Sequence, residues 1–133
     1  PRLRPRPLVA ADLVPVDEAD ARTIAVVQGA STLSLPVLVG TTAWVVIAEE
    51  VLWRAVLIGI ALAWGWSLIA AVAVSSGTFA LNHAYFGGRN ALVKGVEGAL
   101  WAGLFLSGGL LAAVASHLVF NLLAFNVRLE VVR

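Results

Sequence analysis

The chain has 133 residues, of which 60% are apolar and 13% are charged, and its mean hydropathy is +0.92. A soluble domain of this length could not cover so many apolar side chains, which predicts a membrane protein. The net charge of +1 comes with scattered basic residues and argues against nucleic-acid binding. Because the sequence has no cysteine, disulfides and thiolate metal sites are excluded.

Residues 1 to 33 are expected to form a cytoplasmic juxtamembrane arm. They mix arginines with aspartates and a glutamate, and their prolines argue against a long helix. The basic start is not followed directly by a short apolar run, so we expect no signal peptide.

The rest of the chain predicts an all-α, multi-span membrane helix bundle. About 20 apolar residues cross a bilayer as a helix, and Pro36 is a favourable first-turn residue. Gly108 and Gly109 predict a hairpin between the last two helices. The expected intramembrane core covers residues 34 to 127, followed by a short tail at 128 to 133. The four predicted spans are residues 36 to 60, 67 to 86, 91 to 107 and 110 to 126.

The basic residues in the arm, in the polar loop, in the first turn of the third span and in the tail support this count, because Lys and Arg concentrate on the cytoplasmic side. With four spans they fall on one face and place both termini in the cytoplasm. A fifth span at residues 24 to 35 would break this agreement, so we reject it. The same orientation predicts a cavity open to the cytoplasmic leaflet. The basic residues on this face are Arg2, Arg4, Arg6, Arg22, Arg89, Lys94, Arg128 and Arg133.

The third predicted span carries small residues at every fourth position. They would form a ridge that lets a neighbouring helix approach closely, which is a packing role rather than a chemical one. The ridge residues are Gly95, Ala99, Gly103 and Ser107.

The first span contains two carboxylates and a guanidinium, Glu49, Glu50 and Arg54. Unpaired, they would cost on the order of 8 to 10 kcal/mol near the helix centre. Glu50 and Arg54 are four residues apart and can pair on one helical face. Glu49 lies about 100° away around the axis, so we expect it to be the carboxylate available for chemistry. The alternative is an architectural triad.

Both histidines of the chain, His83 and His117, lie in predicted spans. Asn121 is four residues after His117, so one helical face presents an imidazole and an amide. Phe79 is four residues before His83 and could pack against its ring. Imidazoles together with a free carboxylate are suited to general acid/base catalysis or to a metal site. A structural role remains the alternative for either histidine alone.

Two versions of amide hydrolysis fit these groups. In one, Glu49 activates water with the help of His83, while His117 and Asn121 donate hydrogen bonds to the oxyanion. In the other, Zn²⁺ held by His83, His117 and Glu49 activates the water. The sequence leaves both open.

The residues also resemble a known family. Glu49-Glu50-x-x-x-Arg54, Phe79-x-x-x-His83 and His117-x-x-x-Asn121, in this order on successive apolar segments, are similar to the CAAX protease and bacteriocin-processing (CPBP, Abi domain) intramembrane endopeptidases. The resemblance covers about residues 40 to 125. It implies hydrolysis of a membrane-associated or lipidated protein or peptide, with Glu49 and His83 activating water and His117 and Asn121 stabilising the oxyanion. Ala55 stands where the family commonly has glycine.

Two other classes compete with the protease. A non-catalytic scaffold or bacteriocin-immunity protein could keep the polar cluster to bind a partner. A proton or metal-ion transporter could use Glu and His as a relay, but such transporters usually have internal repeats, which this sequence lacks.

Overall fold

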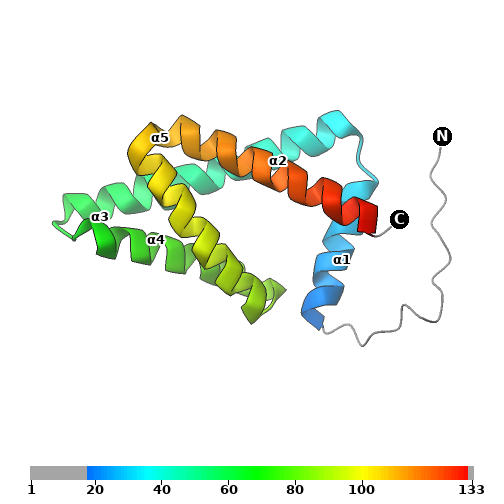
Figure 1. Cartoon of the computed structure of the whole chain (residues 1–133), viewed down its shortest axis with the longest axis horizontal. Coiled ribbons are helices and arrows are strands. Elements are labelled where there is room, and N and C mark those ends of the chain that lie inside the picture. The colour runs from blue at the N-terminus through cyan, green and yellow to red at the C-terminus, as the bar shows by residue number, and fades with distance from the viewer. Residues whose placement is uncertain (1–17, 132–133) are drawn as a thin grey trace.

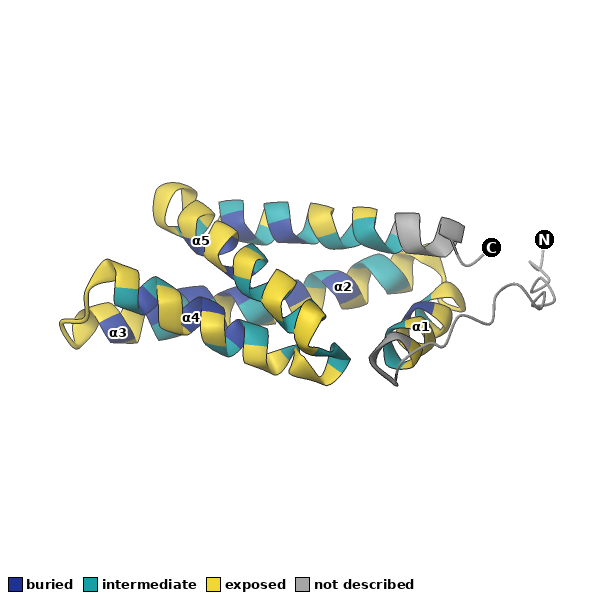
Figure 2. Cartoon of the chain, turned by 60° about the horizontal axis from the view of Figure 1, so that its bottom comes forward, coloured by how far each residue is buried: buried dark blue, intermediate teal, exposed yellow. Residues whose placement is uncertain are grey.

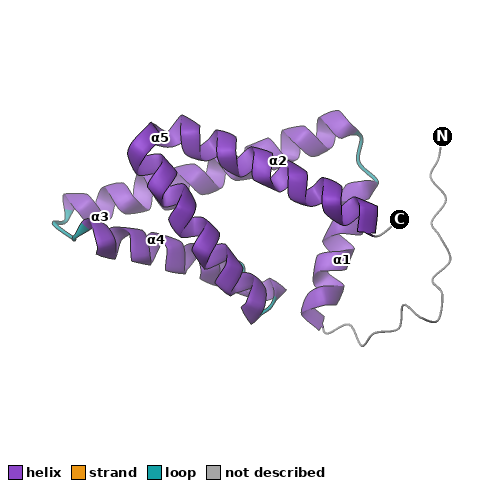
Figure 3. Ribbon diagram, in the orientation of Figure 1, coloured by secondary structure: helices purple, strands orange, loops and turns teal. Residues whose placement is uncertain are grey.

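The computed structural model describes residues 18 to 131, and throughout this range the chain is built from helices and short turns (Figures 1 and 3). This confirms the all-α prediction. Predictions about residues 1 to 17, about residues 132 and 133, and about the side chain of Arg128 lie outside the described residues. The elements are α1 (Glu18–Ser31), α2 (Leu35–Glu50), the π-helix η2 (Val51–Ile58), α3 (Gly59–Ala63), α4 (Leu68–Asn82), the 3₁₀ turn η3 (Ala84–Phe86) and α5 (Gly88–Val131).

The first predicted span corresponds to α2, η2 and α3, which follow one another without a break. Ser34 precedes the first turn, and Pro36 lies within it. The backbone N–H groups of a first turn have no partner within the helix, so a proline there costs no helix hydrogen bond. The π-helix was not predicted. It begins directly after Glu50 and contains Arg54. π-Helices are rare in proteins, and those that occur are frequently found at functional sites.

The π-helix is held against α4 by a side-chain hydrogen bond. The hydroxyl of the buried Ser75 donates to the carbonyl oxygen of Trp53 over 2.6 Å. At the N-terminal end of α4, the Ser67 hydroxyl oxygen accepts from the backbone N–H of Ala70, which caps the helix. The Ser75 contact ties α4 to the part of the chain that carries the charged residues.

The helix α5 consists of two arms that meet at Gly109. This residue has φ 76° and ψ −178°, which only glycine adopts without strain. The chain therefore reverses near the predicted hairpin, although α5 continues through Gly108. Figure 1 shows the first arm in yellow crossing α4 and the second arm in orange and red running beside α2.

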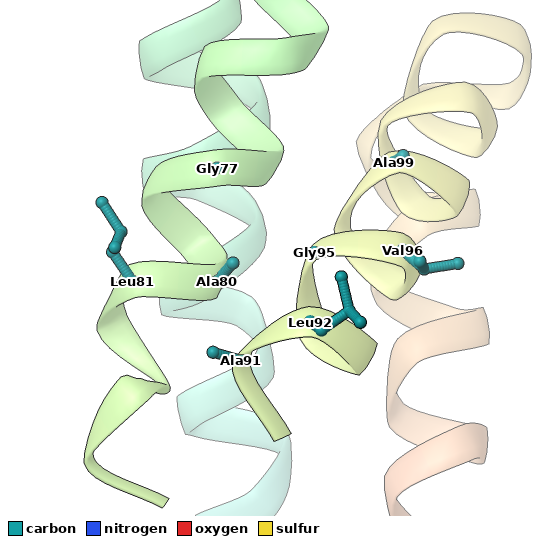
Figure 4. A pocket seen from close by; sticks show the side chains of 8 residues that line it. All are labelled: Gly77, Ala80, Leu81, Ala91, Leu92, Gly95, Val96 and Ala99. Atoms are coloured by element: carbon teal, nitrogen blue, oxygen red, sulfur yellow. The ribbon is translucent and has the colours of Figure 1, made fainter. Parts of the chain in front are cut away.

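Contact between α4 and the first arm of α5 occurs mainly at two glycines. A Cβ on Gly98 would lie 3.1 Å from the Phe79 ring and 3.3 Å from the backbone of Ser76, and one on Gly95 would lie 3.4 Å from Ala80. The predicted ridge was only partly right, because nothing lies within 4 Å of a Cβ on Gly103. The first ridge residues, Gly95 and Ala99, instead line an apolar groove between the two helices (Figure 4).

The predicted juxtamembrane arm contains the helix α1, which the sequence analysis did not expect. Its 14 residues begin after the last proline of the arm, Pro15, so that proline does not interrupt it. The Arg22 guanidinium donates to the backbone oxygen of Tyr85 over 2.8 Å and lies 4.4 Å above the Tyr85 ring. The helix α1 is shorter than a bilayer-crossing helix requires.

By length and composition, one helix among the described residues could cross a membrane, Gly88–Phe125 within α5, and only 11% of its apolar window is buried. Leu68–Asn82 is apolar but shorter. The prediction of four spans therefore stays a prediction.

The interior is small, and Figure 2 shows few buried positions among many exposed ones. Much of this interior is polar. The apolar cluster consists of Ile58, Ala61, Ala71 and Ala102. Among the largest fully buried side chains that the structure describes are Arg54, His117, Glu50 and Ser75. Because burying charge without a partner is costly, these residues require an arrangement that pairs them.

Candidate active site

Glu50 and Arg54 form a fully buried ion pair at the junction of α2 and η2. The Arg54 Nε lies 3.3 Å from Glu50 Oε2, and both side chains are 0% exposed. The pair is an electrostatic contact, since neither Arg54 Nε nor Glu50 Oε2 makes a hydrogen bond within the described part of the chain. Arg54 also donates from Nη2 to the Gly98 carbonyl over 3.2 Å, and its guanidinium lies 4.6 Å from the Phe79 ring centroid. Arg54 thus joins η2, α4 and the first arm of α5.

Glu49 lies between the two histidines. His83 Nε2 is 3.8 Å from Glu49 Oε1, and His117 Nε2 is 3.8 Å from Glu49 Oε2. These distances exceed a direct hydrogen bond. The three side chains come from α2, the C-terminal end of α4 and the second arm of α5, so the fold brings together groups far apart in the sequence.

The other ring nitrogen of each histidine is already engaged. His83 Nδ1 lies 2.9 Å from the backbone oxygen of Phe79, and since a carbonyl only accepts, Nδ1 carries the proton. His117 Nδ1 lies 2.8 Å from Glu50 Oε1. Both contacts direct Nε2 towards Glu49. The Glu50–His117 contact was not predicted, because the sequence analysis assigned Glu50 to Arg54 alone.

Phe79 is the aromatic centre of the site. Its ring is fully buried and lies 4.6 Å from the His83 ring, centroid to centroid. It also meets the His117 ring edge-on at 6.1 Å. Through its carbonyl and its ring, Phe79 restrains His83 in two ways.

One pocket of about 880 Å³ is lined by all four predicted catalytic residues. Its walls come from α1, α2, the turn after α4 and both arms of α5. Glu49 and His83 are 18% and 16% exposed, whereas His117 is 1% exposed. The carboxylate and His83 can therefore meet a ligand, with His117 recessed behind them. The four residues are Glu49, His83, His117 and Asn121.

Two charged pocket residues were missed as site residues. Lys94 Nζ lies 2.6 Å from Glu97 Oε2, and both side chains are largely buried and line the pocket. From the sequence, Lys94 was counted only among the basic residues of the cytoplasmic face. The sequence pattern that could have indicated this pair is a Lys and a Glu three residues apart at the start of an apolar helix. They add a second ion pair to the polar side of the pocket.

The zinc version of the site has suitable donor types, because two imidazole nitrogens face one carboxylate and both Nδ1 atoms have acceptors nearby. However, the described part of the chain has no group of three or more His, Asp or Glu side chains placed to hold a metal ion. We therefore derive no step through a metal.

A family model described as type II CAAX prenyl endopeptidase Rce1-like matches residues 31–123. The chain belongs to this family, whose members are membrane-embedded proteases. The match contains Glu49, His83, His117 and Asn121 and begins at the end of α1. Comparison with curated proteins and with solved structures gave no match.

Proposed function

We propose that this chain is an intramembrane endopeptidase that hydrolyses a peptide bond of a membrane-associated or lipidated protein or peptide. The family supports a protease. The observation that carries the specific proposal is the position of Glu49, whose two carboxylate oxygens each face the Nε2 of a different histidine at the wall of one pocket.

Glu49 and His83 activate the water in this proposal. Both are partly exposed to the pocket, and the 3.8 Å between Glu49 Oε1 and His83 Nε2 leaves the two groups free to share a bridging water. With its Nδ1 proton directed at the Phe79 carbonyl, a neutral His83 presents a lone pair at Nε2. Both groups can therefore accept a proton from the same water molecule.

His117 and Asn121 stabilise the oxyanion. A proton on His117 Nδ1 can be donated to Glu50, so Nε2 donates as well only when the ring is an imidazolium. In that form, the charges of Glu49, Glu50, Arg54 and His117 sum to zero, which is the balance that a buried cluster requires. The recessed His117 is then a fixed donor, and Asn121 on the same arm of α5 supplies a second.

The reaction then has two steps. Water transfers a proton to Glu49 as its oxygen bonds to the carbonyl carbon, and the carbonyl oxygen becomes the oxyanion beside His117 and Asn121. When the tetrahedral intermediate collapses, the C–N bond breaks, and the proton held by Glu49 or His83 passes to the leaving nitrogen. The products are a new carboxylate and a new N-terminal amine.

The bilayer arrangement is also part of the proposal. Large apolar side chains such as Trp44, Ile69 and Leu111 are between 74% and 82% exposed, which favours lipid contact. The contact of Arg22 with Tyr85 supports placing the N-terminal arm on the same side as the loop that holds Arg89. We assign that side, both termini and the pocket opening to the cytoplasm. The arm is residues 1 to 33, the protease core 34 to 127 and the tail 128 to 133.

The proposal is tested by comparing new protein N-termini in host membranes that express the wild-type chain or Glu49→Gln. The variant keeps the shape of the side chain and removes its ability to take the proton. We expect a set of cleavage products found only with the wild-type chain. Identical profiles from equally inserted proteins would contradict the protease and favour the scaffold or immunity protein.

Treating the same membranes with a chelator distinguishes the metal-free mechanism from the zinc-dependent one. If Glu49 acts without a metal, the same products persist when the membranes are treated with a zinc chelator. If Zn²⁺ bound by His83, His117 and Glu49 activates the water, the products disappear and return when zinc is added back.

A further inference from the structure

The indole of Trp101 lies directly against His117. The two rings are stacked, with centroids 3.7 Å apart and planes 16° from parallel. Trp101 is 5% exposed, and it does not line the pocket that Glu49 and His83 share. A ligand in the pocket therefore meets His117 on one side, while Trp101 supports the ring from behind.

Glu50 alone does not fix the orientation of His117. Its hydrogen bond to Nδ1 holds one ring atom over 2.8 Å, but the last torsion of a histidine side chain has broad wells, and the ring can still tilt about that contact. The stacked indole of Trp101 closes one face of the ring. Phe79, edge-on at 6.1 Å, restricts the ring further. The position of Nε2 opposite Glu49 thus depends on the aromatic contacts as well as on Glu50.

Trp101 is itself held in place by other neighbours. Its ring meets Phe79 edge-on at 6.0 Å and Phe120 at 5.8 Å. The Arg54 guanidinium and the Lys94 ammonium lie 5.9 Å and 5.8 Å from its centroid. The indole is therefore a fixed surface against which the His117 ring stacks.

We infer that Trp101 is a positioning residue for the oxyanion donor, because it fixes the plane of the His117 ring. The catalytic consequence rests on the proposed function, whereas the stacking can be measured without activity. The two parts are tested separately.

The activity test compares Trp101→Leu with Trp101→Phe, using a peptide that the membrane experiment identifies. Leucine removes the stacked ring, and we expect kcat to fall about tenfold, since small misplacements of a catalytic group are costly. KM should stay unchanged because Trp101 is outside the pocket. Phenylalanine keeps an aromatic face and should restore most of kcat. Trp53→Leu is the matched control, because Trp53 also contacts the Phe79 ring but not His117.

A folded Trp101→Leu protein with wild-type kcat would overturn the inference, as would a raised KM with unchanged kcat. Should leucine prevent folding, Trp101→Met takes its place, because methionine fills the space without an aromatic face. A Trp101→Met kcat well below that of Trp101→Phe at unchanged KM supports positioning, and a kcat equal to that of Trp101→Phe contradicts it.

The activity-independent test uses the fluorescence of Trp101. Replacing Trp44, Trp53, Trp64 and Trp66 by phenylalanine leaves it as the sole tryptophan of the chain. Removing the stacked ring changes the surroundings of the indole, so His117→Gln should change the emission of Trp101, while His83→Gln should leave its emission unchanged. Equal effects of the two substitutions would overturn the inference. A change caused by His117→Gln alone, in a chain that cleaves nothing, would leave the stacking intact and refute the proposed function alone.

Discussion

Replacing Arg54 by methionine removes a charge on which several helices depend. The guanidinium is fully buried, lies 3.3 Å from Glu50 Oε2, donates to the Gly98 carbonyl and packs against the Phe79 ring. Methionine keeps much of the volume but leaves Glu50 without its arginine. Removing one partner of a buried pair costs about 3 to 5 kcal/mol, a large part of the roughly 5 to 15 kcal/mol by which proteins are stable.

The assay is unfolding of the purified protein in mixed micelles by increasing SDS, followed by far-UV circular dichroism. We expect Arg54→Met to lower the free energy of unfolding by about 3 to 5 kcal/mol. The double variant Glu50→Gln/Arg54→Met is the control, since it removes both charges and retains an oxygen for the His117 contact. It should recover at least about 1 kcal/mol of the loss. An Arg54→Met protein as stable as the wild type, or a double variant less stable than the single one, would refute this account of the pair.

The same assay tests two packing predictions. Gly98→Ala should destabilise the chain by about 1 to 3 kcal/mol, because the new Cβ would lie 3.3 Å from the Ser76 backbone, whereas Gly103→Ala meets nothing within 4 Å and should cost nothing. Equal effects of these two substitutions would contradict the close helix approach. Ser75→Ala removes the hydrogen bond to the Trp53 carbonyl of the π-helix and should cost about 1 to 3 kcal/mol. Ser76→Ala should be neutral, because the buried Ser76 hydroxyl has no hydrogen-bond partner among the described residues. A greater loss of stability in Ser76→Ala than in Ser75→Ala would show that the Ser75 contact does not hold the π-helix.

The helical segments could be predicted from the sequence because their signals are local. Pro36 at a helix start and the reversal at Gly109 are set by the conformational limits of single residues. The pairing of Glu50 with Arg54 is likewise a neighbour relation within one helix. Such features need no knowledge of the tertiary fold.

The remaining features depend on contacts between distant residues. His117 is 67 positions from Glu50, and no helical spacing predicts the hydrogen bond between them. The stacking of Trp101 on His117 depends on the bend at Gly109, which returns the second arm of α5 to the first. The residue types of Val51–Ile58 do not distinguish a π-helix from an α-helix, so the π-helix could not be predicted from them. The sequence therefore indicated four residues that line one pocket but not how each is held.

The central claim is that this chain itself hydrolyses peptide bonds with Glu49. The most direct measurement is cleavage of the peptide identified in membranes by the purified protein in lipid vesicles, comparing the wild type with Glu49→Gln. We predict that the wild-type chain alone cuts the peptide at the mapped bond. The Glu49→Gln protein, unfolding at the same SDS concentration, should leave the peptide intact. Cleavage by Glu49→Gln at the wild-type rate would contradict the account.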